Sequence, residues 1–287
     1  MNDSPTLSIV IVNWNTRDYL IGALSSIYNV LPNFDVQTIV VDNASTDDSA
    51  NTVLARFPNV ELVALPTNTG YAAGNNIGLK RACGEFILLL NPDVVLPAES
   101  LQKAIDIVRS KPGISALGVK QLNPDGSIQR SVRGFPRPIS VMYEALGLSR
   151  IFAQSRLFGA YRMTWFDYSH EAPVDQPMGT FLLIPRHVLE QVGLLDERFP
   201  IFFNEVDWCY RASLLGLTAW YTPEIEILHY GGGSTRQVKP KMAWESRKGL
   251  LDFYRKHYPG LRYLPIFWLA SAASWLQAKI VSARRSA

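Results

Sequence analysis

The chain has few cysteines, no internal repeat and no low-complexity segment. Its 287 residues include only two cysteines, Cys83 and Cys209, which cannot form a disulfide framework, and neither belongs to a Cys-x-x-Cys pair. Glycine (19) and proline (18) occur at ordinary frequency, so no linker of biased composition is indicated. A disulfide-stabilised scaffold is thereby excluded, and a reducing compartment is expected.

Targeting signals are also missing. The amino terminus, Met1–Pro5, is polar and lacks a basic region, and the apolar run Leu7–Val12 is too short for the core of a signal peptide. An uncharged stretch near the carboxyl end, Tyr263–Ala278, is shorter than the roughly 20 residues that cross a bilayer. We therefore expect a cytoplasmic protein.

Charge is unevenly distributed along the chain. Residues 1–235 carry 17 Lys and Arg against 23 Asp and Glu (17 − 23 = −6), whereas residues 236–287 carry 11 against 2 (11 − 2 = +9). Hydrophobic residues make up 47% and charged residues 18%, a globular composition that excludes wholesale disorder. The basic tail indicates a polyanionic partner, either an anionic membrane face or a nucleic acid.

Strand and helix patterns alternate through the first 120 residues. Such alternation predicts an α/β protein with a mostly parallel, twisted sheet and helices on both faces. The region from about 120 to 175 is predicted to be an irregular, partly helical insert. The predicted strands are 7–12, 38–41, 60–65, 86–90 and 180–185, and the predicted helices include 18–28, 74–82, 97–108, 205–216 and 241–258.

Three polar clusters follow the ends of predicted strands, namely Asn13-Trp14-Asn15, Asp42-Asn43 and Asn91-Pro92-Asp93. Ligands of open α/β sheets bind at the carboxyl ends of strands, so we expect these clusters to line one crevice. Asp93 suits Mg²⁺ or Mn²⁺ held together with substrate phosphates. Asp93 suits a turn or helix-cap role equally, whereas the local sequence of Asp42 favours an Asx-turn or cap over hydrogen bonding to a nucleobase or ribose.

A glycine-rich segment, Gly70–Gly78, opens a predicted helix. Small residues there let a backbone approach a ligand closely. The spacing is Gly-x3-Gly-x3-Gly, and no Gly-Lys-Ser/Thr ending follows. The dinucleotide fingerprint and the P-loop are therefore excluded.

Two acids, Glu205 and Asp207, follow aromatic residues at the start of a predicted helix. They suit a general base beside an apolar pocket, although the helix dipole also favours acids in a first turn. Arg211 lies four residues after Asp207, where the two can pair on one helix face. That pairing would leave Glu205 the freer base.

The segment His229–Arg236 combines a histidine, three glycines, two hydroxyls and an arginine. Backbone N–H groups of the glycines and the charge of Arg236 could wrap a diphosphate. His229 could supply a metal ligand through its neutral imidazole, or could be a structural residue.

Together these motifs resemble the family-2 inverting glycosyltransferases with the GT-A fold, in particular the rhamnosyltransferase-like branch. The resemblance covers roughly residues 6 to 250. It rests on five segments in the family's order: Leu7–Asn15, Val40–Asp47, Asn68–Gly78, Asn91–Asp93 and Phe203–Arg211.

The resemblance implies transfer of rhamnose or a similar hexose from a dTDP- or UDP-sugar, with inversion, to a hydroxyl of a glycan or lipid-linked saccharide in cell-wall or surface polysaccharide biosynthesis. It assigns Glu205 as the catalytic base, with Asp207 as fallback, and Asp93 and His229 to Mg²⁺ or Mn²⁺. The predicted contacts to the nucleotide sugar are Val12, Asn13, Trp14, Asp42, Asn75, Asn76, Asn91 and Arg236.

Two positions depart from the family pattern. Asn91 replaces the first acid of Asp-x-Asp, which keeps an oxygen ligand but loses a charge. Asn204-Glu205 replaces the usual acidic pair, so the base assignment keeps Asp207 as its alternative.

The predicted organisation is a GT-A domain over 1–258, with a nucleotide-binding half (1–120) and an acceptor-binding half (121–258). An apolar, basic helix follows over 259–287. Basic residues flank this helix, which is typical of a helix lying on an anionic membrane at its cytoplasmic face. The alternative is a terminal helix packed on the domain or on a partner subunit.

Other functions fit less well. A sugar-1-phosphate nucleotidyltransferase would carry a Gly-rich, Arg-bearing loop after the first strand, where this chain has Asn13–Arg17. A non-catalytic saccharide-binding or scaffold domain predicts loss of the acids at 93, 205 and 207. No nucleic-acid partner is expected, because the tail lacks stacking aromatics interleaved with its basic residues on a sheet.

Overall fold

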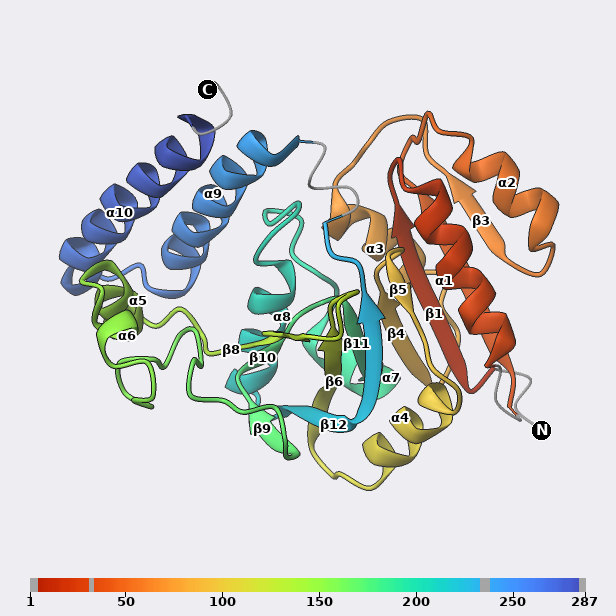
Figure 1. Cartoon of the computed structure of the whole chain (residues 1–287), viewed down its shortest axis with the longest axis horizontal. Helices are drawn as coiled ribbons and strands as arrows, with labels where there is room; N and C mark the ends of the chain where they lie inside the picture. The colour runs from red at the N-terminus through yellow and green to blue at the C-terminus, as the bar shows by residue number, and fades with distance from the viewer. Residues whose placement is uncertain (1–4, 31–33, 233–237, 284–287) are drawn as a thin grey trace.

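A mixed sheet of ten strands runs through the centre of the computed structural model, which describes residues 5–30, 34–232 and 238–283 (Figure 1). Its main strand order is β3-β2-β1-β4-β11-β6-β12-β5. The first four strands in sequence are parallel and alternate with helices, as the sequence predicts. These elements are β1 (Leu7–Asn13), α1 (Arg17–Asn29), β2 (Val36–Asp42), α2 (Ser49–Arg56), β3 (Glu61–Ala64), α3 (Tyr71–Leu79) and β4 (Phe86–Leu90).

Helices cover both faces of the sheet. Because successive side chains of a strand point to opposite faces, each central strand contributes to two cores. Ile9 and Ile11 of β1 pack against α1, α2 and α4 (Ser100–Arg109) in one core. Val10 and Val12 pack on the opposite face against α3, α7 (Arg186–Val192) and α8 (Asn204–Leu214). The near-continuous apolar runs of the central strands thus reflect helices on both faces.

The other half of the sheet mixes strand directions. β11 (Phe181–Pro185) is antiparallel to both β4 and β6 (Ile114–Leu122), whereas β12 (Thr218–His229) runs parallel to β6. Neither β6 nor β12 is predicted from the sequence pattern. β12 contains Pro223, and the pairing with β6 shifts register between Thr222 and Glu226, which is how a strand accommodates a proline.

The region from about 120 to 175 is irregular and partly helical, as predicted. Its elements are short, with two helices and strand pairs at its edges. They are β7 (Ile128–Gln129), β8 (Val132–Arg133), α5 (Pro138–Ala145), α6 (Leu148–Ile151), β9 (Ala172–Val174) and, just beyond, β10 (Gln176–Pro177).

Two long helices complete the described chain, α9 (Lys239–His257) and α10 (Leu264–Ala283). They lie with α5 and α6 at the end of the molecule remote from α2 and β3 (Figure 1). α10 packs on α9 and α5 through Ala270 and Ile266, which contact Val141 and Tyr254. Within the described ranges, no helix combines the length and the apolar character needed to cross a membrane.

Candidate active site

A cleft of about 620 Å³ opens at the carboxyl ends of β1 and β4. Val12, Trp14 and Asn91 line it from the strand ends, and Glu205 lines it from the first turn of α8. Four of the predicted site residues, separated widely in the chain, therefore meet at one cavity. The remaining lining includes Asn43, Asn68–Tyr71, Met178–Thr180, Pro200–Phe202, Val238, Lys241, Met242 and Glu245.

Asn13 and Asp42 lie beneath the cleft surface as neighbours in the β1–β2 register. Asn13 Nδ2 donates to Asp42 Oδ1 at 3.0 Å and to Ser45 Oγ at 3.1 Å. Ser45 N donates to the other carboxylate oxygen of Asp42 at 3.0 Å. This network ties the loops after both strands together, and the predicted direct contact of either residue with the nucleotide sugar stays a prediction.

Asn43 holds the loop that leads into α3, a role that the sequence analysis did not assign to it. Its Oδ1 accepts from Thr69 N at 2.8 Å, and its Nδ2 donates to Gly70 O at 3.0 Å. Gly70 has a φ of +90°, and a Cβ there would lie 3.0 Å from Pro200 O. Gly70 therefore permits close packing of two loops beside the cleft, whereas Gly74 and Gly78 permit close packing of α3 on Val12 and Val10 of β1.

Asn75 and Asn76 of α3 are both buried and do not line the cleft. Asn76 Nδ2 donates to Leu195 O and to Glu197 Oε1, each at 2.9 Å, and its Oδ1 accepts from Leu195 N at 3.0 Å. Asn75 Nδ2 donates to Tyr71 O at 2.9 Å. The bonds of Asn76 fix α3 to the segment around Leu195, whereas that of Asn75 lies within α3, and the predicted nucleotide contacts of the two asparagines stay predictions.

Glu205 and Asp93 act on the same tyrosine. Tyr71 Oη donates to Asn91 Oδ1 at 3.0 Å and lies 3.2 Å from Gly179 O. Burial raises the pKa of Tyr71, and the charges of Glu205 and then Asp93 raise it further. Tyr71 lines the cleft together with Glu205, whereas Asp93 and His229 are not among the residues that line it.

Glu205 has the electrostatics of a general base. Burial raises its pKa above the ordinary value of 4.5, and backbone N–H groups at the start of α8, those of Glu205 and Val206, offset part of that rise. A Cβ on Gly179 would lie 3.6 Å from Glu205 Cβ, so that glycine packs directly against the acid. A carboxylate that is poorly solvated binds a proton more readily, which suits proton abstraction.

Asp207 faces away from this cleft into an ion cluster. Its side chain is fully buried, and it accepts from Arg211 Nε at 2.9 Å, Lys256 Nζ at 2.5 Å and His257 Nε2 at 2.8 Å. Burial acts to raise the pKa of Asp207, but its bonds to His257, Lys256 and Arg211 hold the pKa below the ordinary value. The predicted Asp207–Arg211 pair is confirmed, and both oxygens of Asp207 are engaged.

Asp93 and His229 form a buried pair where β12 meets β5 (Val94–Val95). His229 Nε2 lies 3.3 Å from Asp93 Oδ1 but makes no hydrogen bond in the described structure. Gln129 Nε2 donates to His229 O and to Asn123 Oδ1, both at 2.7 Å, which leaves Gln129 Oε1 to accept from His229 Nδ1 at 2.7 Å.

This arrangement fits a divalent cation. Because Nδ1 of His229 carries the proton that Gln129 accepts, a neutral imidazole turns the lone pair of Nε2 toward the carboxylate of Asp93. Metal-binding histidines are oriented in this way by a second hydrogen bond. Among the described residues, no group of three or more His, Cys, Asp or Glu gathers around a metal position, so further ligands would come from phosphate oxygens or water. Arg236 lies outside the described residues.

The fold and the site together fit the GT-A class of protein: the sheet has a cleft at its strand ends, Glu205 is a base candidate in that cleft, and the Asp93–His229 pair lies outside its lining. The model of glycosyl transferase family 2 matches residues 8–168, more than half of the chain. The chain therefore belongs to glycosyl transferase family 2.

Curated relatives extend the likeness over the whole chain. It is 28% identical over 294 residues to the N-acetylglucosaminyl-diphospho-decaprenol L-rhamnosyltransferase of Mycobacterium tuberculosis, covering 98% of this chain and 95% of the relative. It is 26% identical over 181 residues to rhamnosyltransferase WbbL of Escherichia coli K12, covering 60% and 65%.

Solved structures agree with the fold. The mannosyltransferase PcManGT from Pyrobaculum calidifontis, in complex with GDP-Man and Mn²⁺, gives a TM-score of 0.59 at 16% identity, covering 99% of this chain and 76% of that one. TarS 1-349 of S. aureus, in complex with UDP, gives a TM-score of 0.54 at 18% identity, covering 90% of this chain and 73% of that one. At these identities the likeness establishes the fold alone.

Proposed function

We propose that the protein transfers rhamnose or a similar hexose from a dTDP- or UDP-sugar to a hydroxyl of a lipid-linked saccharide, with inversion. The proposal is carried by the placement of Glu205 in the same cleft as Val12, Trp14 and Asn91. The names of the M. tuberculosis and E. coli relatives support the sugar, and the diphospho-decaprenol in the first name supports a lipid-linked acceptor.

Glu205 would act as the base. It removes the proton from the acceptor hydroxyl as that oxygen attacks C1 of the donor sugar, while the bond from C1 to the diphosphate oxygen breaks. One such displacement inverts the anomeric centre and needs no covalent intermediate. Asp207 is a poor alternative, because three cations hold its pKa low and occupy both of its oxygens.

Asp93 and His229 would hold Mg²⁺ or Mn²⁺ together with the donor diphosphate. A divalent cation there would neutralise the charge that develops on the leaving nucleoside diphosphate. The residues of this chain supply the oriented imidazole and a carboxylate that is itself buried. Asn91 keeps Tyr71 in place beside Glu205 through their hydrogen bond.

A thermal-shift panel of nucleoside diphosphates and their sugars, with and without Mn²⁺, tests this function. We expect UDP or dTDP to raise the melting temperature, and Mn²⁺ to increase that rise. Transfer of labelled sugar to a lipid-linked saccharide would then establish the reaction. No stabilisation by any nucleotide would contradict the proposal and favour a non-catalytic saccharide-binding domain.

We further propose that the end of the molecule formed by α5, α6 and α10 rests on the anionic cytoplasmic face of a membrane. Ten of the fifteen exposed large hydrophobic side chains in the described structure lie in residues 139–157 and 261–276. Such concentration is typical of an interaction surface. Two tryptophans, Trp268 and Trp275, are exposed on α10, where interfacial helices commonly carry them.

A further inference from the structure

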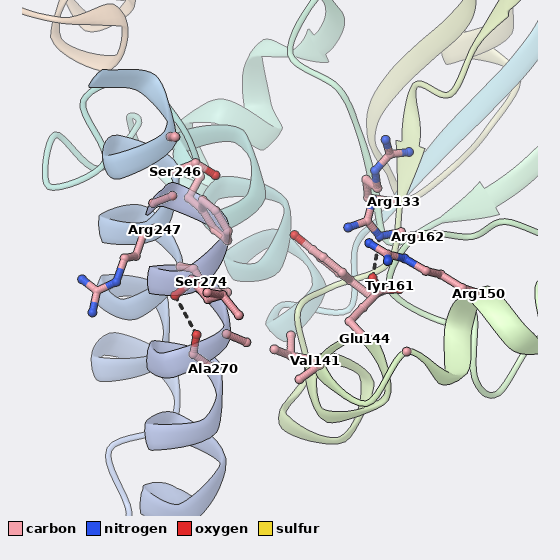
Figure 2. Close-up of a pocket in the computed structure, with 18 of the residues that line it drawn as sticks. Arg133, Val141, Glu144, Arg150, Tyr161, Arg162, Ser246, Arg247, Ala270 and Ser274 are labelled. Carbon is pink, nitrogen blue, oxygen red and sulfur yellow. Dashed lines mark hydrogen bonds and ion pairs between the residues drawn. The ribbon is translucent and has the colours of Figure 1, made fainter. Parts of the chain in front are cut away.

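A second cavity, of about 930 Å³, lies between the α5–α6 region and the pair α9–α10. Figure 2 shows its two walls, with Arg133, Arg150, Arg162 and Tyr161 on one side and the two long helices on the other. No predicted site residue lines it, and the glycosyl-transfer chemistry proposed above does not use it.

The first wall carries excess positive charge. Arg133, Arg150 and Arg162 line it, whereas Glu144 is the only acid among the described lining residues. Glu144 Oε2 accepts from Arg162 Nε at 2.5 Å, and within the described chain neither Arg133 nor Arg150 forms an ion pair. Guanidinium groups gathered around one space match the several oxygens of a phosphate or diphosphate.

The opposite wall is mainly apolar but also carries Ser246, Arg247 and Ser274, and Arg247 Nη2 donates to Ser271 Oγ at 2.9 Å. Its apolar residues include Leu250 of α9 with Ala270, Ala273 and Leu276 of α10, and Leu250 packs in one cluster with Ala270 and with Val141 of α5. Small alanines on α10 leave room for a hydrocarbon chain. Leu276 lines the cavity and is also 56% exposed, so the apolar wall continues onto the exposed face of α10.

This cavity adjoins the cleft that holds Glu205. Met242 of α9 lines both cavities, and Phe203, two residues before Glu205, lines the second one. Tyr161 reaches from the arginine wall toward the helices (Figure 2). Burial raises the pKa of its hydroxyl, on which the charges of Arg133, Arg162 and Glu205 also act.

We infer that this cavity binds the phosphate-bearing headgroup of an amphiphilic acceptor. Arg133, Arg150 and Arg162 surround the anion, and the α9–α10 wall contacts the first part of its hydrocarbon chain. The inference rests on the proposed function and deepens it: the acceptor sugar, linked to that headgroup, would extend past Met242 into the cleft of Glu205. The chain would leave along Leu276 toward the exposed face of α10.

Binding of farnesyl diphosphate to the full-length protein tests this inference. Isothermal calorimetry is run with the nucleotide cleft filled by Mn²⁺ and whichever nucleoside diphosphate stabilises the protein, so that the probe cannot compete there. We expect saturable binding by the wild type and about tenfold or more weaker binding by Arg133→Gln/Arg150→Gln. Arg130→Gln, an exposed arginine outside the cavity, is the matched control and should bind as the wild type does.

Two further probes separate a headgroup from a free anion. Inorganic diphosphate and farnesol should each bind much more weakly than farnesyl diphosphate, because each engages one wall only. Ala273→Trp fills the apolar wall, so it should weaken binding of farnesyl diphosphate and leave that of inorganic diphosphate unchanged. This variant also keeps the test valid if the arginine variants fail to fold.

Each contrary result has a distinct meaning. Equal affinity of the wild type and the double arginine variant would overturn the inference, as would equal affinity for inorganic and farnesyl diphosphate. If nucleotides bind and farnesyl diphosphate does not, the inference fails and the proposed function stands. If farnesyl diphosphate binds but no nucleotide does, the proposed function fails instead.

Discussion

His229 Nε2 lies 3.3 Å from Asp93 Oδ1, although His229 ends β12 and Asp93 directly precedes β5, far away in the chain. The antiparallel pairing of His229 with Val94 brings them together, and Gln129 sets the orientation of the imidazole. Both residues are buried, and Nε2 of His229 makes no hydrogen bond in the described structure. This fits the proposed role of Nε2 as a metal ligand.

Gln129→Ala should therefore weaken Mn²⁺ binding. Without Gln129 Oε1, the Nδ1 proton of His229 loses its acceptor, and the imidazole loses its fixed orientation. Loss of such an outer partner typically lowers metal affinity about 10–100-fold. Titration of Mn²⁺ against thermal stability, with saturating nucleoside diphosphate, measures the change. Gln102→Ala on α4, which bonds only to Asp106 among the described residues, is the control, and equal Mn²⁺ affinity in both variants would refute the metal assignment.

Glu205→Gln should abolish transfer while leaving donor binding intact. The amide cannot accept the proton of the acceptor hydroxyl, and loss of a general base typically lowers the rate about 10²–10⁴-fold. Radiolabelled sugar transfer gives kcat, and thermal shift gives nucleotide affinity. A variant that keeps wild-type turnover would remove Glu205 from the mechanism.

The activity should also decrease as the pH is lowered, and this decrease should occur at a higher pH than an ordinary carboxylate would give. Because burial raises the pKa of Glu205 above 4.5, the ionised base is lost as pH decreases through that raised value. In a plot of kcat/KM against pH, the midpoint of the acidic limb should therefore lie above pH 4.5. A limb at or below that value would show that burial does not perturb the base.

Asp207→Asn should destabilise the fold. It leaves Arg211, Lys256 and His257 around a neutral amide, and breaking a buried charge cluster costs about 3–5 kcal/mol. Urea unfolding measures this cost, with Asp252→Asn, which removes an outer pair to Arg255 on α9, as the control. The folded fraction of Asp207→Asn should still transfer sugar, and an inactive but equally stable variant would point to Asp207 as the base.

The same cluster predicts the acid sensitivity of the fold. Hydrogen bonds hold the pKa of Asp207 below its ordinary value of 3.8 in the folded state. The stabilising contribution is therefore present above pH 3.8 and is lost as pH falls through the depressed value of the folded state. Unfolding free energy measured against pH should decline less steeply below pH 4 in Asp207→Asn than in the wild type. Parallel curves for the two proteins would contradict this account.

Trp268→Ser/Trp275→Ser should reduce recovery of the protein with vesicles of anionic phospholipid. Both side chains are exposed on α10, at 66% and 47%, and burying such aromatic surface in the membrane interface drives adsorption. Co-sedimentation measures the bound fraction. Leu54→Ser on α2 and Leu214→Ser on α8 remove comparably exposed apolar side chains elsewhere, and an equal loss in those variants would show that no particular face is used.

Part of the site was predictable because its signals are local. Val12, Asn91 and Glu205 each stand at the end of a strand or the start of a helix, and the fold places such positions at one edge of the sheet. The Asp207–Arg211 pair follows from helical spacing alone. These features depend on residues only a few positions apart.

Other features depend on which segments meet. No local pattern indicates that Lys256 and His257 of α9 complete the charge cluster of Asp207. None indicates that Asn76 forms a hydrogen bond to Leu195, which is distant in the chain. The strand β12 was missed because Pro223 interrupts its pattern, and the bulge that accommodates the proline exists only in the pairing with β6.

Local patterns of residues suffice to predict the alternation of buried strands and helices, the polar residues at the strand ends, and an apolar, basic carboxyl end. The periodicity of apolar residues is visible among neighbouring positions, so these properties can be predicted without the rest of the chain. The folded structure was needed to show that His229 lies beside Asp93, that cations surround Asp207 while Glu205 lines the cleft, and that three arginines lie opposite the α9–α10 pair. Strand order and helix packing set these contacts. Both depend on which apolar surfaces, distant in the chain, are buried against one another.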